Sequence, residues 1–261
     1  MSSHVLRVFS YLPNPRVWKA LIAADYLGVT VEVIGDKPKN LGNWLWDFDA
    51  RELQAEEKTS DSPHARVSRR GFSGTLYKTD AFMLAQPYGT VPAAFSPDGT
   101  VGIFESNSIL RAVARSAEAE HSLYGRNSME ASRVDSFLDA TLVFGREAQV
   151  YLLGIDALSQ ELHQRMAGAF EFYVQGVENA LTNHEFVAGD ELTIADIAFV
   201  CDVSQFLRER LLSSALEAQS LSMVSRGADQ VFPRTFAHLF SLIEKPQFHK
   251  YLGDYTKHLK G

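Results

Sequence analysis

The sequence predicts an α/β domain followed by an all-helical domain, and three observations support this division. Residues 5–35 read as strand, helix and strand in succession, which is the pattern of a βαβ unit. Asp98-Gly99, between two apolar runs, is a strong signal for a β-hairpin. Beyond about residue 118 the apolar residues recur only at helical spacing. We therefore expect one domain over residues 1–117 and a second over 118–261.

The first elements follow from local patterns. VLRVFSY at 5–11 is short and rich in β-forming residues, so it is expected to be a strand. Residues 16–28 have apolar side chains at helical spacing and stop at Gly28, a typical helix C-cap. Residues 29–35 form the second strand, which we expect to run parallel to the first.

Residues 36–75 interrupt this regular order. The segment mixes two tryptophans with charge clusters, serine and glycine. Two interpretations stay open: a long excursion of this kind is often a mobile lid or a partner surface, or it holds an inserted helix over roughly 44–57 and a solvated loop.

A short helix over 78–89, the hairpin and a helix over 106–117 complete the first domain. Its order is then βαβ–α–ββ–α.

The second domain is expected to be a bundle, since LTIAD at 192–196 places Thr193 and Asp196 at the spacing of a capping box. We interpret that pair as a folding element and not as a catalytic one.

Composition excludes several classes of protein. The 261 residues carry a net charge of −7 and no basic stripe, which argues against nucleic acid as a partner. The apolar runs are too short to span a membrane, and the N-terminus lacks the pattern of a secretory signal. The eight histidines show no metal-binding spacing, so no metal is expected.

The single cysteine, Cys201, excludes a disulfide within one chain and fits a reducing, cytoplasmic compartment. Its apolar helical setting favours a buried structural thiol over a nucleophile.

Two motifs of the first domain suggest a binding site. Val91-Pro92 precedes the hairpin. A trans proline could simply start the strand, whereas a cis bond would expose the Val91 backbone for pairing with a peptide-like ligand. In FESNSI, a helix that begins at Ser106 would offer free N–H groups and a hydroxyl to an anion, and Glu105 would accept from an ammonium group. The alternative is that Ser106 is only an N-cap.

Together these features resemble the cytosolic glutathione transferases. The resemblance rests on the order βαβ–α–ββ–α, the VP before the hairpin, the ES at the last helix and LTIAD, and it covers the chain except about 36–75. It implies a thioredoxin-like first domain and an all-α second domain. RVWKALIAADYLGVTVEV, IFESNSILR, FVAGDELTIADIAFVC and EKPQFHKYLG are more closely similar to the transferase-like domain of the gamma subunit of translation elongation factor one. Because the chain ends at Gly261, we expect a free-standing transferase of that lineage.

The resemblance implies a glutathione site. Glu105 and Ser106 match the residues that bind the γ-glutamyl group, and Val91, before a cis-Pro92, matches the residue whose backbone pairs with the cysteinyl unit.

At the other end of the peptide, Lys78 matches a basic residue that binds the glycine carboxylate. Thr90 stands where glutamine or lysine is more usual.

The residue that activates the thiol is expected in SYLPNPR after the first strand. A free thiol has a pKa near ~8.5, so it needs a donor that stabilises the thiolate. The absence of cysteine in this turn argues against a disulfide-exchanging enzyme. Ser10, Tyr11 and Asn14 remain, and the sequence favours Asn14, with Tyr11 next.

The function expected from the resemblance is a detoxifying glutathione transferase in the cytoplasm, whose activated thiol attacks an apolar or aromatic electrophile in a conjugation or in a thiolytic cleavage. Glutathione would be its co-substrate, and a homodimer its assembly. The second domain would supply the apolar wall of the electrophile pocket through Phe144, Tyr151 and Phe206. The alternative is a non-catalytic module for protein interaction, related to the elongation factor subunit.

Overall fold

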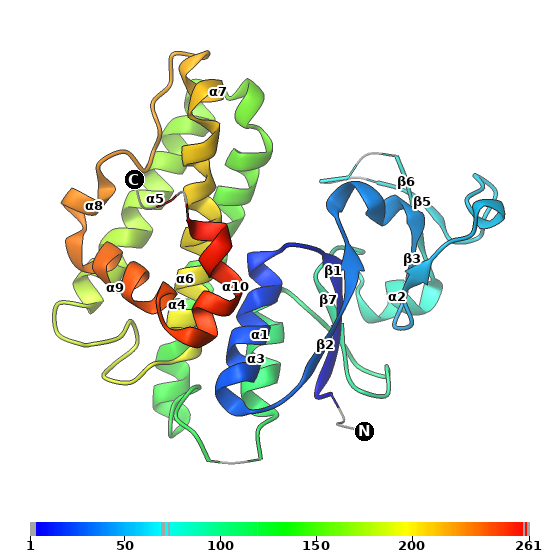
Figure 1. Cartoon of the computed structure of the whole chain (residues 1–261), viewed down its shortest axis with the longest axis horizontal. Helices are drawn as coiled ribbons and strands as arrows, with labels where there is room; N and C mark the ends of the chain where they lie inside the picture. Colours follow the sequence, from blue (N-terminus) through cyan, green and yellow to red (C-terminus); the bar gives the residue numbers. More distant parts are fainter. Residues whose placement is uncertain (1–3, 69–70, 73, 119, 258, 260–261) are drawn as a thin grey trace. The chain divides into compact units, whose positions relative to one another are not determined.

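The structure is a computed structural model that describes residues 4–68, 71–72, 74–118, 120–257 and 259. The chain divides into two compact units, Met1–Glu118 and Ala119–Gly261, each with its own secondary structure (Figure 1).

The first unit begins with the predicted βαβ unit. Strand β1 (Leu6–Tyr11) leads through helix α1 (Pro15–Leu27) to strand β2 (Val31–Asp36). The two strands are parallel, with Leu6 paired to Val31. Helix α1 ends at Gly28, which has a positive φ of 67°. Both the parallel pairing and the glycine C-cap are confirmed.

The hairpin completes the main sheet. Strands β7 (Ala93–Phe95) and β8 (Gly102–Phe104) pair antiparallel, and β7 pairs antiparallel with β1, so that the strand order is β2-β1-β7-β8. Helix α2 (Asp80–Ala85) precedes the hairpin and α3 (Ser106–Arg115) follows it. Helices α1 and α3 pack side by side (Figure 1). The predicted order βαβ–α–ββ–α is therefore present.

The segment 36–75 contributes a second four-stranded sheet, and the expected helix over 44–57 is wrong. Its strands are β3 (Trp44–Trp46), β4 (Arg51–Glu52), β5 (Ala65–Val67) and β6 (Thr75–Lys78), in the order β4-β3-β6-β5. The 3-10 helix η1 (Pro38–Asn43) precedes β3, and a second one, η2 (Ala55–Glu57), lies between β4 and β5. Trp46 explains the difference: its ring is fully buried and its Nε1 donates to the Leu41 carbonyl at 3.0 Å, which suits an aromatic strand position better than an exposed helix.

An aromatic cluster joins the two sheets. Trp46 contacts Phe9 of β1 at 5.5 Å between ring centroids and Phe82 of α2 at 5.8 Å, both edge to face. Phe48 meets Phe95 of β7 in the same way at 5.8 Å. Such aromatic pairs stabilise a core beyond the area that they bury. The described part of the segment is thus packed onto the main sheet.

A half-buried cation, Arg7, reinforces this packing. The Arg7 guanidinium of β1 donates to Glu32 at 2.6 Å, pairs with Asp49 and lies 4.3 Å from the centre of the Phe48 ring. The hydrogen bond that Arg7 donates to Glu32 raises the pKa of Arg7 most, against the opposing effect of burial. Arg7 therefore connects β1, β2 and the β3–β4 turn.

The second unit is all helical. Its helices are α4 (Ser128–Leu153), α5 (Gln160–Ala180), α6 (Ile194–Phe206), α7 (Ser213–Glu217), α8 (Ala228–Val231), α9 (Pro233–Ile243) and α10 (Pro246–Thr256), with 3-10 turns η3 (Ile155–Ala157) and η4 (Leu207–Leu212). Helix α6 is central, because every residue in it except Gln205 is buried. The predicted capping box of Thr193 and Asp196 is present at its start. Cys201 is buried and outside any disulfide, as expected.

The aromatic residues expected to line a pocket are core residues instead. The rings of Phe144 and Tyr173 stack with their centroids 4.5 Å apart, and the ring centroids of Phe206 and Phe170 are 4.8 Å apart. The Tyr151 hydroxyl donates to the buried Glu209 at 2.6 Å. Phe144, Tyr151 and Phe206 are at most 2% exposed, so the predicted pocket wall is wrong for these three.

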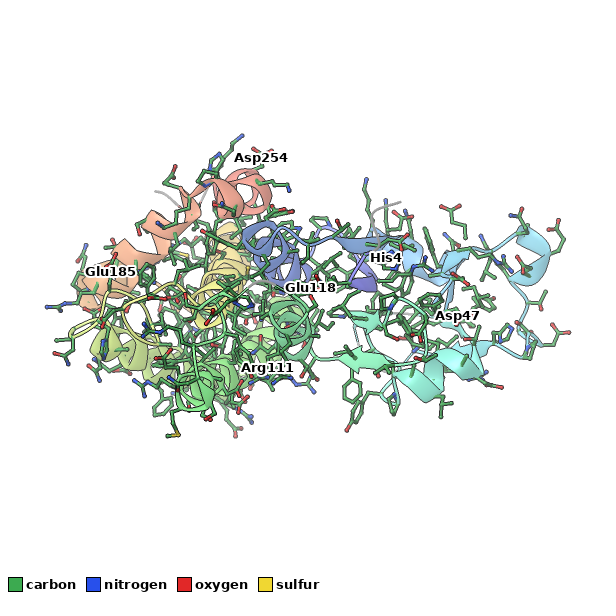
Figure 2. All side chains as sticks on the ribbon, turned by 90° about the horizontal axis from the view of Figure 1, so that it is seen from below. His4, Asp47, Arg111, Glu118, Glu185 and Asp254 are labelled. Carbon is green, nitrogen blue, oxygen red and sulfur yellow. The ribbon has the colours of Figure 1, made fainter. Side chains whose placement is uncertain are left out.

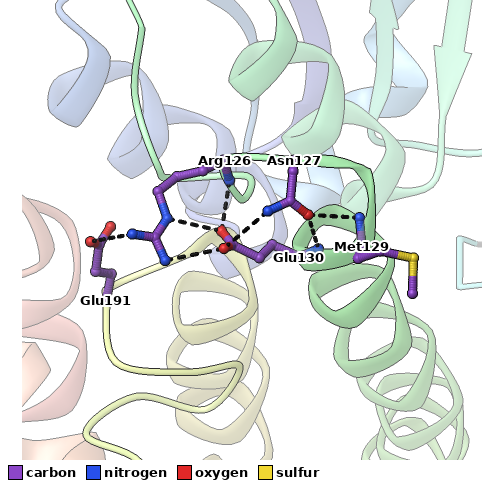
Figure 3. A network of polar contacts seen from close by, with 5 residues as sticks. All are labelled: Arg126, Asn127, Met129, Glu130 and Glu191. Carbon is purple, nitrogen blue, oxygen red and sulfur yellow. Dashed lines mark hydrogen bonds and ion pairs between the residues drawn. The ribbon is translucent and has the colours of Figure 1, made fainter.

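Polar and charged side chains hold the start of α4 and lie on the surface of this unit. Asn127 caps α4, accepting from the backbone of Met129 and Glu130, and Arg126 pairs with Glu130 and Glu191 (Figure 3). Exposed carboxylates such as Glu185 and Asp254 project from the surface (Figure 2).

Candidate functional site

The nine predicted site residues all belong to the first unit. They lie at the end of β1, in β6, in the loop before β7 and at the start of α3: Ser10, Tyr11, Asn14, Lys78, Thr90, Val91, Pro92, Glu105 and Ser106.

The strand register brings three of these segments together. Phe9 pairs with Ala93, and Ala93 pairs with Phe104. When the two registers are continued past the strand ends, Val91 comes opposite Tyr11, and Pro92 comes opposite Glu105. The end of β1, the Val91-Pro92 step and the start of α3 therefore form one edge of the main sheet.

Helix α3 begins at Ser106, as predicted. Glu105 precedes it as the N-cap residue, but no side chain caps the helix. The interpretation of Ser106 as the N-cap is therefore wrong. The first N–H groups of a helix have no partner within it, and the start of a helix favours a ligand that carries negative charge.

The Glu105 backbone is strained. Its φ is 64° and its ψ is 127°, which is disfavoured for a residue with a side chain. Residues held in such conformations cost on the order of 1–3 kcal/mol and cluster at functional sites. The Glu105 side chain is exposed, so its carboxylate can reach a ligand.

Lys19 was not predicted as a site residue. It comes from α1, is only 1% exposed, and its Nζ donates to Ser106 Oγ at 3.1 Å and to Asn107 Oδ1 at 2.8 Å. A buried lysine is rare. The available signal was its place on the apolar face of α1, beside Ala20 and four residues before Ala23, both fully buried.

The Val91-Pro92 peptide bond is cis, which confirms one of the two interpretations of this motif. Val91 is half-buried against the aromatic cluster. The loop in front of it is held by Gln86, whose Nε2 donates to the Thr90 carbonyl at 2.9 Å and to the Thr90 hydroxyl at 2.6 Å.

Lys78 holds the same loop from the other side. It is the last residue of β6, is 9% exposed, and its Nζ donates to the Gly89 carbonyl at 2.6 Å. The ammonium lies 4.7 Å from the centre of the Trp46 ring. Burial lowers the pKa of Lys78, and the nearby charge of Arg66 lowers it further.

The turn after β1 separates the three candidates for thiol activation. Ser10 and Asn14 are fully buried, and Asn14 Nδ2 donates to Ser10 Oγ at 3.1 Å. Asn14 Oδ1 caps α1 by accepting from the Arg16 N–H at 3.0 Å. Tyr11 ends β1 and is half-buried beside the aromatic cluster. Of the three, only Tyr11 reaches the surface.

Neither a metal cluster nor a membrane-spanning helix is found where the structure is described. No group of three or more His, Cys, Asp or Glu residues there could hold a metal ion. Among these same residues, no helix is long and apolar enough to cross a membrane.

Comparison with known structures defines the fold. A glutathione transferase of Phanerochaete chrysosporium in complex with oxidized glutathione has a TM-score of 0.63 at 17% identity, over 97% of each chain. Glutathione transferase E6 of Drosophila melanogaster has a TM-score of 0.63 at 19% identity, over 97% of this chain and 94% of that one. Residues 130–218 match the family model "Glutathione S-transferase, C-terminal domain". The chain therefore has the glutathione transferase fold, and the predicted fold class is confirmed.

Comparison of sequences identifies relatives of this chain. The chain is 23% identical over 258 residues to "Probable elongation factor 1-gamma 1" of Arabidopsis thaliana, covering 95% of this chain and 49% of that protein. It is 26% identical to elongation factor 1-gamma of Mus musculus, over 95% and 46%. It is also 25% identical to a glutathione S-transferase-like protein of a Fusarium species, over 73% of each. The chain is thus homologous to elongation factor 1-gamma and spans about half the length of those relatives.

Proposed function

We propose that this protein is a glutathione transferase, which binds glutathione on the first unit and activates its thiol to attack an apolar or aromatic electrophile. The observation that carries the proposal is the single sheet edge formed by Tyr11, the cis Val91-Pro92 step and the start of α3. On that edge, Glu105 is held in a strained conformation without a capping role. A scaffold alone gains nothing from such strain.

In this proposal the γ-glutamyl end lies at the start of α3. Its carboxylate accepts from N–H groups of the first turn and from the Ser106 hydroxyl, in the field of the helix dipole. Its ammonium group donates to the exposed Glu105 carboxylate. The Val91 backbone pairs with the cysteinyl unit as an added strand would.

The glycine end is proposed to lie near the loop before β7. An ammonium has three N–H donors, and Lys78 uses one on Gly89, so it can also bond to a carboxylate. The Thr90 hydroxyl and carbonyl are already paired with Gln86. Thr90 therefore acts through the shape of the loop that positions Val91.

Tyr11 is now the first candidate for thiol activation, ahead of Asn14 and Ser10, because those two are fully buried and bonded to each other. A hydroxyl that donates to the sulfur stabilises the thiolate. Lowering the thiol pKa by about two units requires about 2.7 kcal/mol of such preference.

The test has two stages. The protein is first passed over immobilised glutathione and then assayed for conjugation of glutathione to an electrophilic aromatic compound. We expect retention and measurable conjugation, and Tyr11→Phe should lower kcat at neutral pH while it leaves retention unchanged. Absence of both retention and conjugation in the wild-type protein would refute the proposal.

A second candidate function is a non-catalytic interaction module. It is favoured by the homology to proteins named elongation factor 1-gamma and by the added second sheet, which offers a further surface. Retention on glutathione without conjugation of any electrophile, together with a Tyr11→Phe variant that behaves as wild type, would support this candidate.

We further propose a homodimer, which would act in the cytoplasm. In the first unit, Leu84 is 85% exposed and Tyr88 is 73% exposed. In the second unit, α4 exposes Met129, Val143 and Val150, whose spacing in multiples of seven places them on one helical face. Exposed apolar side chains gathered on a helix face are typical of an interface.

The helical unit is proposed to bind the electrophile, through residues other than Phe144, Tyr151 and Phe206.

A further inference from the structure

We infer that Lys19 is a positioning residue for the ligand carboxylate: its ammonium fixes the Ser106 hydroxyl as a donor that points toward the bound α-carboxylate. The inference rests on the proposed glutathione site. It adds a buried residue of α1 to a site that is otherwise built from the sheet edge and the start of α3.

The direction of the hydrogen bonds carries the argument. A lysine ammonium can only donate, so the bond of 3.1 Å between Lys19 Nζ and Ser106 Oγ uses Ser106 as the acceptor. The second bond, at 2.8 Å to Asn107 Oδ1, holds the ammonium in place. A hydroxyl has one donor and two acceptor sites. With Lys19 on the acceptor side, the Ser106 proton is turned away from the ammonium and is left for another acceptor.

Burial increases the effect. Lys19 and Ser106 are 1% and 6% exposed, so water screens the charge weakly. A hydrogen bond from a charged donor is stronger than a neutral one and polarises the group that accepts it. The Ser106 hydroxyl thereby becomes a better donor. A carboxylate at the start of α3 would be attracted by the helix dipole and by this ammonium together.

The inference predicts which part of a ligand Lys19 helps to bind. Its contribution to affinity should depend on the α-carboxylate of the γ-glutamyl group and not on the rest of the tripeptide. A matched pair of probes separates the two: glutathione, and 4-aminobutyryl-cysteinyl-glycine, which keeps the amino group and lacks only the α-carboxylate. Removal of Lys19 should weaken binding of the first and spare the second.

Isothermal titration calorimetry under reducing conditions tests this with wild type, Lys19→Met, Lys19→Arg and the control Lys39→Met. Lys39 is exposed in η1, so its variant makes the same change in net charge away from α3. Lys19→Met should lower the affinity for glutathione about tenfold, a change of about 1.4 kcal/mol, and should not weaken the analogue. Lys19→Arg should recover part of the loss, and Lys39→Met should match wild type.

The outcomes distinguish the inference from the proposed function. If wild type binds glutathione and Lys19→Met keeps the same ratio of the two affinities, the inference is wrong and the site stands. If wild type binds neither probe, both fail. Should Lys19→Met not fold, Lys19→Gln, whose amide can still donate to Ser106 without a charge, is measured instead. An unchanged preference for glutathione in that variant would equally overturn the role of the charge.

Discussion

Gly35 shows how closely the two backbones of the βαβ unit approach beside the candidate site. It pairs with Ser10 across β1 and β2, and a Cβ at position 35 would lie 1.7 Å from the Ser10 carbonyl oxygen. No real Cβ contact is that short, so any side chain must displace the strand. Ser10 is next to Tyr11, and the displacement would reach the proposed thiol-activating residue.

We therefore expect Gly35→Ala to lower the free energy of unfolding by more than about 4 kcal/mol, a loss found only when a specific structural requirement is broken. Gly28→Ala is the matched control. Gly28 also has a positive φ, but no atom lies within 4 Å of the position its Cβ would take, so the cost should be only about 1–2 kcal/mol. Urea unfolding measures both, and equal losses would contradict the explanation by close approach.

Glu178 makes the helical unit sensitive to acid. Burial acts to raise the pKa of this carboxylate, but hydrogen bonds from the Thr235 N–H and hydroxyl and from Arg234 together outweigh it, so the pKa is lowered. Because the folded state then binds the proton less well than the unfolded chain does, the stabilisation is present above about pH 4.5, the ordinary value. It is lost as the pH falls through the lower folded pKa.

Glu178→Gln should therefore reduce stability at pH 7 and flatten its decline below pH 4.5, measured as the free energy of unfolding across pH 3–7. Glu185→Gln, at an exposed position, serves as the control and should follow wild type. A Glu178→Gln curve parallel to wild type throughout would show that this carboxylate is not responsible.

At the residue scale, the sequence predicted which residues lie near the candidate site better than it predicted what each side chain does there. The sequence favours Asn14 for thiol activation because of its position at the start of a helix, and Asn14 does lie at the start of α1. Its side chain is, however, engaged in the capping bond and in the bond to Ser10. Lys19 was missed because the sequence does not reveal which turn of a distant helix lies against α1. Periodicity identified Phe144 and Phe206 as apolar, but it does not distinguish a core position from a pocket wall.

At the scale of elements, the second sheet is the least predictable part of the chain. Its strands are two to four residues long, and β3 pairs with β6 across some thirty intervening residues. Strands this short give no alternating pattern, and pairing at such separation leaves no local signal. The βαβ unit was predictable for the opposite reason, since its strands, helix and glycine stop are all encoded within thirty residues.

Trp46 should be the residue on which this sheet most depends. Trp46→Ala is expected to lower the free energy of unfolding by about 3–5 kcal/mol, because it removes a fully buried aromatic side chain. Trp44→Ala, at a half-exposed position of the same strand, should cost clearly less. Chemical unfolding compares the two, and a ranking in the opposite order would contradict the role of Trp46 as the centre of the cluster.

At the scale of the whole molecule, the fold was predictable because many weak signals agree. VP, ES and LTIAD are each common, but their order along the chain is specific to one arrangement of elements. The activity was not predictable to the same degree. The relatives include both a transferase-like protein and elongation factor subunits, and the choice depends on side chains in one turn, SYLPNPR.

The proposed dimer gives a prediction at this scale. Val143→Asp places a charge on the exposed apolar face of α4 and should convert the dimer to a monomer, measured by sedimentation velocity. Leu211→Asp is the control, because Leu211 is 51% exposed in η4 and not on that face. If wild type sediments as a monomer, or if Val143→Asp remains dimeric, the assignment of this face is wrong.

The parallel pairing of β3 with β6 has a consequence for insertions and deletions in this part of the chain. Parallel neighbours start at the same end, so the chain enters β3 next to the point where it later enters β6. Gly42 indeed lies beside the Thr75 carbonyl, 3.5 Å from the position of a Cβ on Gly42. The segment over 44–74 therefore begins and ends at neighbouring points of the chain. A single insertion or deletion in an ancestral gene could therefore add or remove it without rerouting the rest of the domain.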